Sequence, residues 1–80
     1  MKMEKEVLIT VTDRKCPWLQ TSQTIIEIQN NAPIDDLVKI IDEFIDETEY
    51  RKVDVVIDPL NFEFTSEEVE YLIENDIEVY

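Results

Sequence analysis

Glycine is absent from all 80 residues of this chain, and that absence constrains the fold more than any motif does. Glycine adopts a positive φ at no steric cost, so turns and helix ends here must use other residues, chiefly Asn and Asp. The glycine-rich loops that cradle phosphates in nucleotide-binding proteins are excluded as well. The chain is therefore expected to form strands and helices joined by open loops or by turns built on Asn and Asp.

Histidine is also absent, and Cys16 is the single cysteine. Without histidine, Ser-His-Asp and Cys-His catalysis and His-containing zinc sites are excluded. Cys16 has no partner for a disulfide within the chain, and it reads as an inert thiol or, with flanking bases, a redox thiol. We expect no enzymatic activity and no cofactor.

Periodicity predicts the elements of one domain over residues 1–80. Strands with a two-residue period are expected at 6–12, 24–29 and 52–58, with a short last strand at 77–80. The second face of these strands also carries apolar residues, Leu8, Ile25 and Val56, and the nearly continuous run at 53–57 predicts a central strand covered on more than one side.

Two helices are expected at 33–48 and 65–75. Pro33 suits the start of the first, and apolar residues follow it at helical spacing. Thr65 and Glu68 form a capping-box pattern for the second, which Asn75-Asp76 ends. The order ββαβαβ predicts an α+β fold: a four-stranded mixed sheet with an antiparallel hairpin, a parallel last pair and both helices on one face.

The charge is strongly negative, at −13, and is unevenly distributed. The first 31 residues have no net charge, whereas residues 53–80 contain nine acids and no base. An acidic surface disfavours nucleic acid and anionic lipid, and it suits a partner with a basic surface. The absence of a long apolar run predicts no membrane span, and the lone cysteine and lack of a signal peptide favour a cytoplasmic protein.

The acids of the two predicted helices are the first candidate site. Those of the second helix extend the surface formed by those of the first. Several lie at the C-terminal end of the first helix, where negative charge opposes the helix dipole. Their density along the first helix, one charge per about 3 Å, resembles that of a DNA strand. The alternative is a solvated face that serves only solubility. The residues are Asp35, Asp36, Asp42, Glu43, Asp46, Glu47, Glu49, Glu67, Glu70 and Glu74.

The loop between the first two strands is the second candidate site. Arg14 and Trp18 are residue types that anchor protein interfaces. Two hypotheses remain open: Trp18 is an exposed anchor, or it folds back as a lid over a small core.

Strand-end carboxylates are the third candidate. Asp13 and Asp58 each follow an apolar strand, and a carboxylate pair of this kind can bind Mg²⁺ in a small metal-dependent enzyme.

Residues 55–67 contain an apolar strand, an Asp, and apolar residues four and six positions further on, at Phe62 and Phe64. This segment resembles the strand-to-helix segment of STAS-type regulatory domains. The phosphorylatable Ser and following Gly of that family correspond here to Glu67 and Glu68, so the resemblance does not imply the regulatory chemistry.

Taken together, the sequence predicts a non-enzymatic protein-binding module. The leading hypothesis is an inhibitor or modulator of a basic, nucleic-acid-handling protein that acts by DNA mimicry, as its small size and acidity suit a phage or mobile-element product. The alternative is a regulatory partner that binds through a sheet edge and the Trp18 loop. A homodimer is compatible with both hypotheses.

Overall fold

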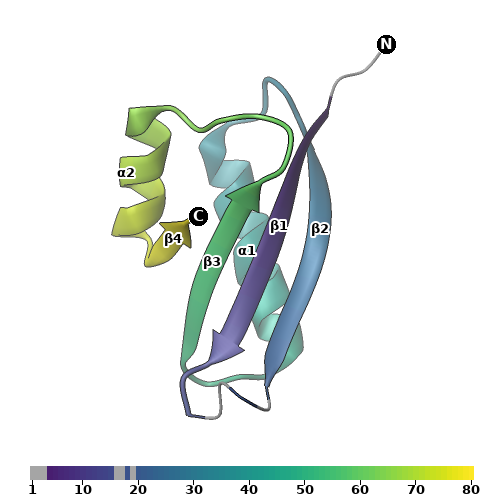
Figure 1. The fold of residues 1–80 in the computed structure, drawn as a ribbon, viewed down its shortest axis with the longest axis vertical. Helices are drawn as coiled ribbons and strands as arrows, with labels where there is room; N and C mark the ends of the chain where they lie inside the picture. Colours follow the sequence, from purple (N-terminus) through teal and green to yellow (C-terminus); the bar gives the residue numbers. More distant parts are fainter. Residues whose placement is uncertain (1–3, 16–17, 19) are drawn as a thin grey trace.

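The computed structural model describes residues 4–15, 18 and 20–80. The order is ββαβαβ, and the strands form one sheet in the order β2-β1-β3-β4 (Figure 1). The predicted α+β class and element order are confirmed. The elements are β1 (Glu4–Asp13), β2 (Thr21–Gln29), α1 (Ile34–Thr48), β3 (Val53–Pro59), α2 (Ser66–Glu74) and β4 (Ile77–Val79).

The strand pairing is mixed, as predicted. β1 pairs antiparallel with β2 and with β3, whereas β3 and β4 are parallel. Backbone hydrogen bonds continue the β1–β3 ladder past the strand ends, from Arg14 N to Lys52 O and from Leu60 N to Glu6 O. The antiparallel β1–β3 pairing thus brings the Arg14 end of the first hairpin beside residues 51 and 52.

The core lies between one face of the sheet and the two helices. Side chains at alternate positions of β1, β3 and β4 meet Leu37 and Ile41 of α1 and Leu72 of α2. Because both helices contribute to this one cluster, they cover the same face, and α1 lies behind the sheet in Figure 1. The buried set is Val7, Ile9, Val11, Leu37, Ile41, Val55, Ile57, Leu72 and Ile77.

The helix ends show how the chain manages without glycine. Asp76 adopts a left-handed φ of 62° directly after α2, as the Asn-Asp stop predicts. At the end of α1 the left-handed residue is Glu49, also with φ 62°, although Asn and Asp were the expected types. The predicted capping box of α2 is present, with reciprocal bonds between Thr65 and Glu68.

No helix of the described residues packs against the opposite face of the sheet, and Figure 1 looks onto this face. β3 is central, as predicted, but the prediction that it is covered on more than one side is wrong. Val56 is only half-buried there, since neighbouring strands shield it and no second layer does. Within the described residues, no helix is long and apolar enough to cross a membrane.

Candidate functional site

The solvent side of α1 carries the acids that the sequence singled out. All are exposed, because the stripe at Leu37 and Ile41 directs the opposite side of the helix outward. Glu49 is the C-cap residue directly after them. Six of these acids form two rows at spacings of seven and four residues, Asp35–Asp42–Asp46 and Asp36–Glu43–Glu47.

These carboxylates are not neutralised from within the part of the chain that the structure describes. Neither helix has a base in its last turn. Lys39, which lies among the acids of α1, forms no ion pair there, since the ion pair found joins Arg14 to Asp54. Asp46 and Glu47 therefore face the negative end of the helix dipole without compensation, at a cost of some tenths of a kcal/mol each.

A contact between the helices extends this surface onto α2. The hydroxyl of Tyr71 donates a hydrogen bond to Asp35 of α1. That bond is the main cause that raises the pKa of Tyr71, and the nearby negative charges of Asp35 and Glu74 act in the same direction. Glu67 and Glu74 lie one turn on either side of Tyr71, and the bond from Tyr71 places this part of α2 beside the start of α1. We call the ten predicted helix acids the acidic helical surface.

The second candidate site is the loop between β1 and β2, which contains Arg14 and Trp18. Trp18 is 75% exposed, which contradicts the lid hypothesis, because the core is complete without this ring. Arg14 donates to the Asp54 carboxylate over 2.7 Å, and both side chains are more than half exposed. Such a surface pair adds at most about 1 kcal/mol to stability and leaves Arg14 accessible. Cys16 lies outside the described residues.

Sequence reasoning missed a second feature near this loop. The hydrogen bond from Arg14 N to Lys52 O brings Lys15 and Arg51 to the same end of the sheet. Four of the seven basic residues therefore lie at one pole of an otherwise acidic molecule. This cluster of bases could not be predicted from the sequence. The pair at 14–15 and the pair at 51–52 are far apart in the chain and meet only through the antiparallel pairing of β1 with β3.

The proposed metal pair is not assembled. Asp58 lies opposite Leu8 in the β1–β3 ladder, five residues from Asp13 along β1, which is about 17 Å. The two side chains also point to opposite faces of the sheet, by alternation. Asp13 instead accepts a hydrogen bond from the backbone N–H of Lys15 and so stabilises the turn. The described residues contain no group of three metal-ligating side chains.

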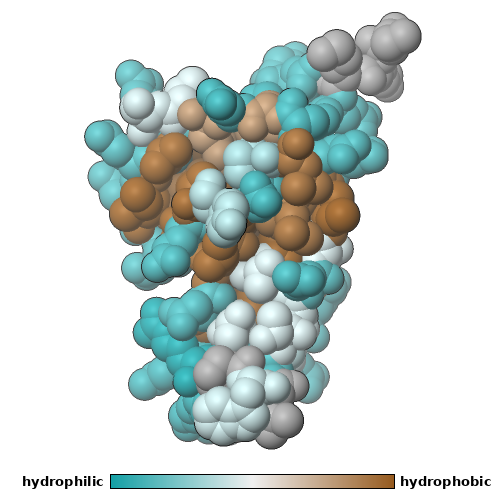
Figure 2. Space-filling model, viewed as in Figure 1, coloured by the Kyte–Doolittle hydropathy of each residue, from teal (hydrophilic) through white to brown (hydrophobic). Residues whose placement is uncertain are grey.

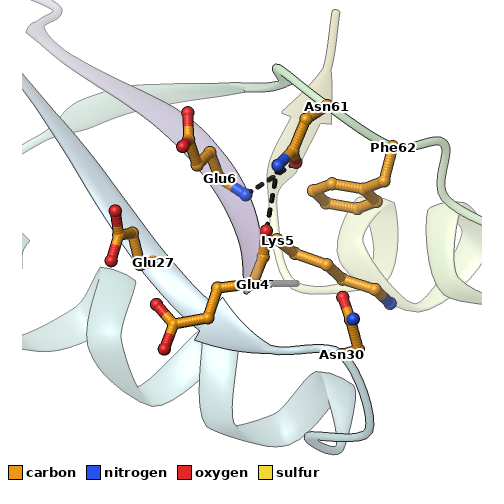
Figure 3. A pocket seen from close by; sticks show the side chains of 7 residues that line it. All are labelled: Glu4, Lys5, Glu6, Glu27, Asn30, Asn61 and Phe62. Atoms are coloured by element: carbon orange, nitrogen blue, oxygen red, sulfur yellow. Dashed lines mark hydrogen bonds between the residues drawn. The ribbon is translucent and has the colours of Figure 1, made fainter. Parts of the chain in front are cut away.

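A hollow of about 470 Å³ lies at the N-terminal end of β1 (Figure 3). Asn61 anchors the loop after β3 there, because its side chain accepts from Glu6 N and donates to Glu4 O. Glu4 and Lys5 leave β1 in opposite directions, and the Lys5 ammonium lies 5.1 Å from the centre of the Phe62 ring. The hollow thus has a carboxylate side and a cation–aromatic side.

The carboxylate side of this hollow holds a pair of like charges. The neighbouring Glu27 carboxyl, which favours the protonated form of Glu4 as a hydrogen-bond partner and repels its ionised form, raises the pKa of Glu4. The two groups meet because Glu27 lies opposite Glu6, which shares a face of β1 with Glu4. They lie at one end of the open face of the sheet.

The open face also holds apolar residues that sequence reasoning did not connect to a site. Leu8, Ile25 and Val56 lie on this face together with Asp58. Alternation predicted that the three apolar side chains occupy the second face of their strands. Strand order and register were needed to show that they are neighbours.

Comparison of the chain with protein-family models, curated protein sequences and solved structures finds no match.

Proposed function

We propose that this protein is a non-enzymatic binding module whose acidic helical surface occupies a basic, nucleic-acid-binding surface of a target protein. It competes with nucleic acid for that surface and so inhibits or modulates the target. A protein partner with a basic surface is the expected ligand, and direct binding of nucleic acid or anionic membranes is not expected, because like charges repel.

The observation that supports this proposal is the placement of the helix acids. Solubility requires only that charges be exposed, and it does not depend on where along a helix they lie. Here Asp46, Glu47 and Glu49 lie at the end of α1 where bases stabilise a helix, and no base is present in that turn. A surface that sacrifices helix stability to keep one sign of charge is expected where that sign is needed for binding.

The spacing of the charges supports the same proposal. The 15 residues of α1 rise over about 22 Å, and with Glu49 they carry seven carboxylates, one per about 3 Å. One strand of DNA carries a charge per about 3.4 Å. The two rows on α1, with Glu67 and Glu74 beside them, also give the charges width across the surface.

A displacement assay tests the proposal directly. A fluorescent duplex DNA is bound to each of a panel of purified DNA-binding domains, and its release by this protein is followed by anisotropy over a salt series. The triple variant Asp42→Asn, Asp46→Asn and Glu47→Gln removes three charges from α1. The matched control, Glu27→Gln, Glu63→Gln and Glu78→Gln, removes three exposed charges elsewhere, so both variants have the same net charge.

We expect release of DNA from at least one class of domain, with an affinity that falls as salt rises. The α1 variant should weaken that affinity by about tenfold or more, whereas the control should stay within about twofold of the parent. The proposal is wrong if no domain releases its DNA, or if the two variants weaken release equally, because the effect would then depend on net charge alone.

A second candidate function depends on β2 and Trp18. β2 is an edge strand of nine residues, Glu27 is its one charged residue, and the nearby Trp18 ring is exposed. Long edge strands with little charge pair with extended segments of partner proteins. Binding of this kind is nearly insensitive to salt and should be abolished by Trp18→Ala while the α1 triple variant leaves it unchanged. The same salt series therefore separates the two functions.

A further inference from the structure

The register of the strands defines what the open face presents. Leu8 of β1 lies between Ile25 of β2 and Asp58 of β3, and Thr10 lies between Gln23 and Val56. Ile25 is 59% exposed, although it is a large apolar side chain. Figure 2 shows apolar side chains gathered in a band across this face, with hydrophilic ones among and around them. The open face is thus apolar at its centre.

Asp58 lies within that apolar centre. Leu8 is its direct neighbour on β1, and Val56 and Leu60 are the residues two positions away along its own chain, on the same face. On the β4 side, Tyr80 donates its backbone N–H to Ile57, and alternation places its side chain on the face of Glu78, which lies opposite Val56. Asp58 therefore has apolar neighbours on β1 and along its own chain, with Glu6 and Glu78 diagonal to it on the same face.

The described part of the chain supplies no cation to this carboxylate. The ion pair found there is that of Arg14 with Asp54, further along β3. Asp58 is half-buried, so its neighbours already remove part of its hydration. A carboxylate in this setting gains more from an incoming cation than a fully solvated one does, because the local dielectric constant is lower.

A second copy of this chain does not suit the open face. Glutamates at its margins, Glu6, Glu27 and Glu78, give the face further negative charge. Two copies packed face to face would bring Asp58 and these glutamates against carboxylates of the same sign. Like charges directly opposed across a desolvated interface cost several kcal/mol. Complementarity requires a basic group within an apolar surface.

We propose that the open face of the sheet is a docking surface for a partner protein that inserts an arginine at Asp58. The guanidinium pairs with the carboxylate, ideally through two parallel N–H···O bonds. The aliphatic part of the arginine and the apolar residues beside it lie on Leu8, Ile25, Val56 and Leu60. Arginine among apolar residues is typical of interface hot spots.

This surface is distinct from the acidic helical surface, since the sheet separates the two. It also differs in chemistry: the outer sides of the helices carry mostly carboxylates, whereas the open face has an apolar centre that contains Asp58 and is bordered by further charged residues. Failure of DNA displacement therefore leaves this inference intact, and the reverse also holds.

The test is a titration of the ¹⁵N-labelled protein with short peptides, followed by NMR. The probe is acetyl-Leu-Arg-Leu-amide. Two further peptides each remove one element, acetyl-Leu-Gln-Leu-amide the charge and acetyl-Ala-Arg-Ala-amide the apolar flanks. Asp58→Asn is compared with Asp36→Asn, which makes the same chemical change on α1. Ile25→Ser tests the apolar part separately at an exposed position.

We expect amide shifts on β1, β2 and β3 with the first peptide, and binding at least fivefold weaker with each of the other two. Asp58→Asn should weaken binding at least fivefold and Ile25→Ser about threefold, while Asp36→Asn stays within twofold. The inference is overturned if the shifts fall on the helices, if the two Asp variants behave alike, or if no shift occurs at millimolar peptide. It is also overturned if sedimentation of the free protein shows a dimer that Ile25→Ser dissociates, because a second copy would then be the occupant.

Discussion

The helical layer and the open sheet face present two different chemistries on opposite sides of one small domain. On α1 and α2 the exposed residues are mostly carboxylates, and most of the apolar ones are directed into the core, although Ile73 of α2 is exposed. On the open face apolar side chains stay accessible and lie beside Asp58, with further acids at the margins. The helical layer is built for long-range charge, whereas the open face is built for contact.

The difference arises from the period of each element. A helix with a 3.6-residue period hides most of its apolar residues on one side, so its outer side is free to be uniform in charge. A strand alternates, and β1, β2 and β3 place apolar residues on both faces while only one face is covered. The apolar residues of the second face should therefore contribute little to folding, which leaves their exposure to be explained.

The largest expected effect tests that statement on the two faces of one sheet. Ile9→Ala removes side-chain atoms from the buried face and should lower the free energy of unfolding by about 2–5 kcal/mol. The identical change at Ile25, on the open face, should alter it by no more than about 0.5 kcal/mol. Urea unfolding followed by circular dichroism measures both.

If Ile9→Ala leaves no folded protein to measure, Ile9→Val and Ile25→Val make the same comparison with one methyl group. Comparable losses at the two positions would show that the open face is covered in the free protein, and the contrast between the faces would not hold.

A smaller effect is expected from the placement of charge along α1. Glu47→Lys puts a base in the last turn and should raise the free energy of unfolding by about 0.3–1 kcal/mol. Asp36→Lys makes the same change in net charge in the first turn and should lower it by a similar amount. Chemical unfolding at low salt measures the free energy of unfolding of both variants. Because both make the same change in net charge, the general reduction of charge repulsion cancels in the difference between them.

The same pair of variants sharpens the functional comparison. Should Glu47→Lys stabilise the protein but weaken DNA displacement, the acid is kept for binding at the expense of stability. Equal shifts in stability for the two variants would instead mean that the dipole is screened and that the position of the acids along α1 has no cost.

Features that depend on local sequence were predictable. The stripe at Leu37 and Ile41 predicted α1, and the spacing of Thr65 and Glu68 predicted the cap of α2, because each depends on residues within one or two turns. The left-handed Glu49 was not predicted, since Glu has no local preference for that conformation and the path of the chain into β3 sets where the helix ends.

Features that depend on strand register were not predictable. Asp13 and Asp58 looked alike as strand-end acids, yet antiparallel pairing separates them along the sheet and directs them to opposite faces. The same pairing surrounds Asp58 with apolar residues and gathers the bases near Arg14. The acids of the candidate helical site were found from the sequence, whereas the open face required the structure.

The smallest expected effect concerns the acids at the end of the open face. The pKa of Glu4 is raised by the neighbouring Glu27 carboxyl, first as a hydrogen-bond partner for the protonated form and then by charge repulsion. The folded state therefore binds this proton more tightly than the unfolded state. The corresponding stability is fully present below the ordinary pKa of a glutamate, about 4.3, and is lost as pH rises through the raised value. The protein should therefore lose stability between about pH 4 and neutral pH at this pair.

Glu27→Gln removes the repulsion and should raise the melting temperature near pH 7 while flattening its dependence on pH. Glu63→Gln removes one negative charge at a position away from the pair. Its effect therefore reports only the general reduction of charge repulsion in an acidic molecule. Melting curves of both variants at several pH values isolate the pair by difference. Identical pH profiles would show that the Glu4–Glu27 contact does not persist in solution. The acids at this end of the open face would then act independently, and the contrast would reduce to the apolar centre around Asp58.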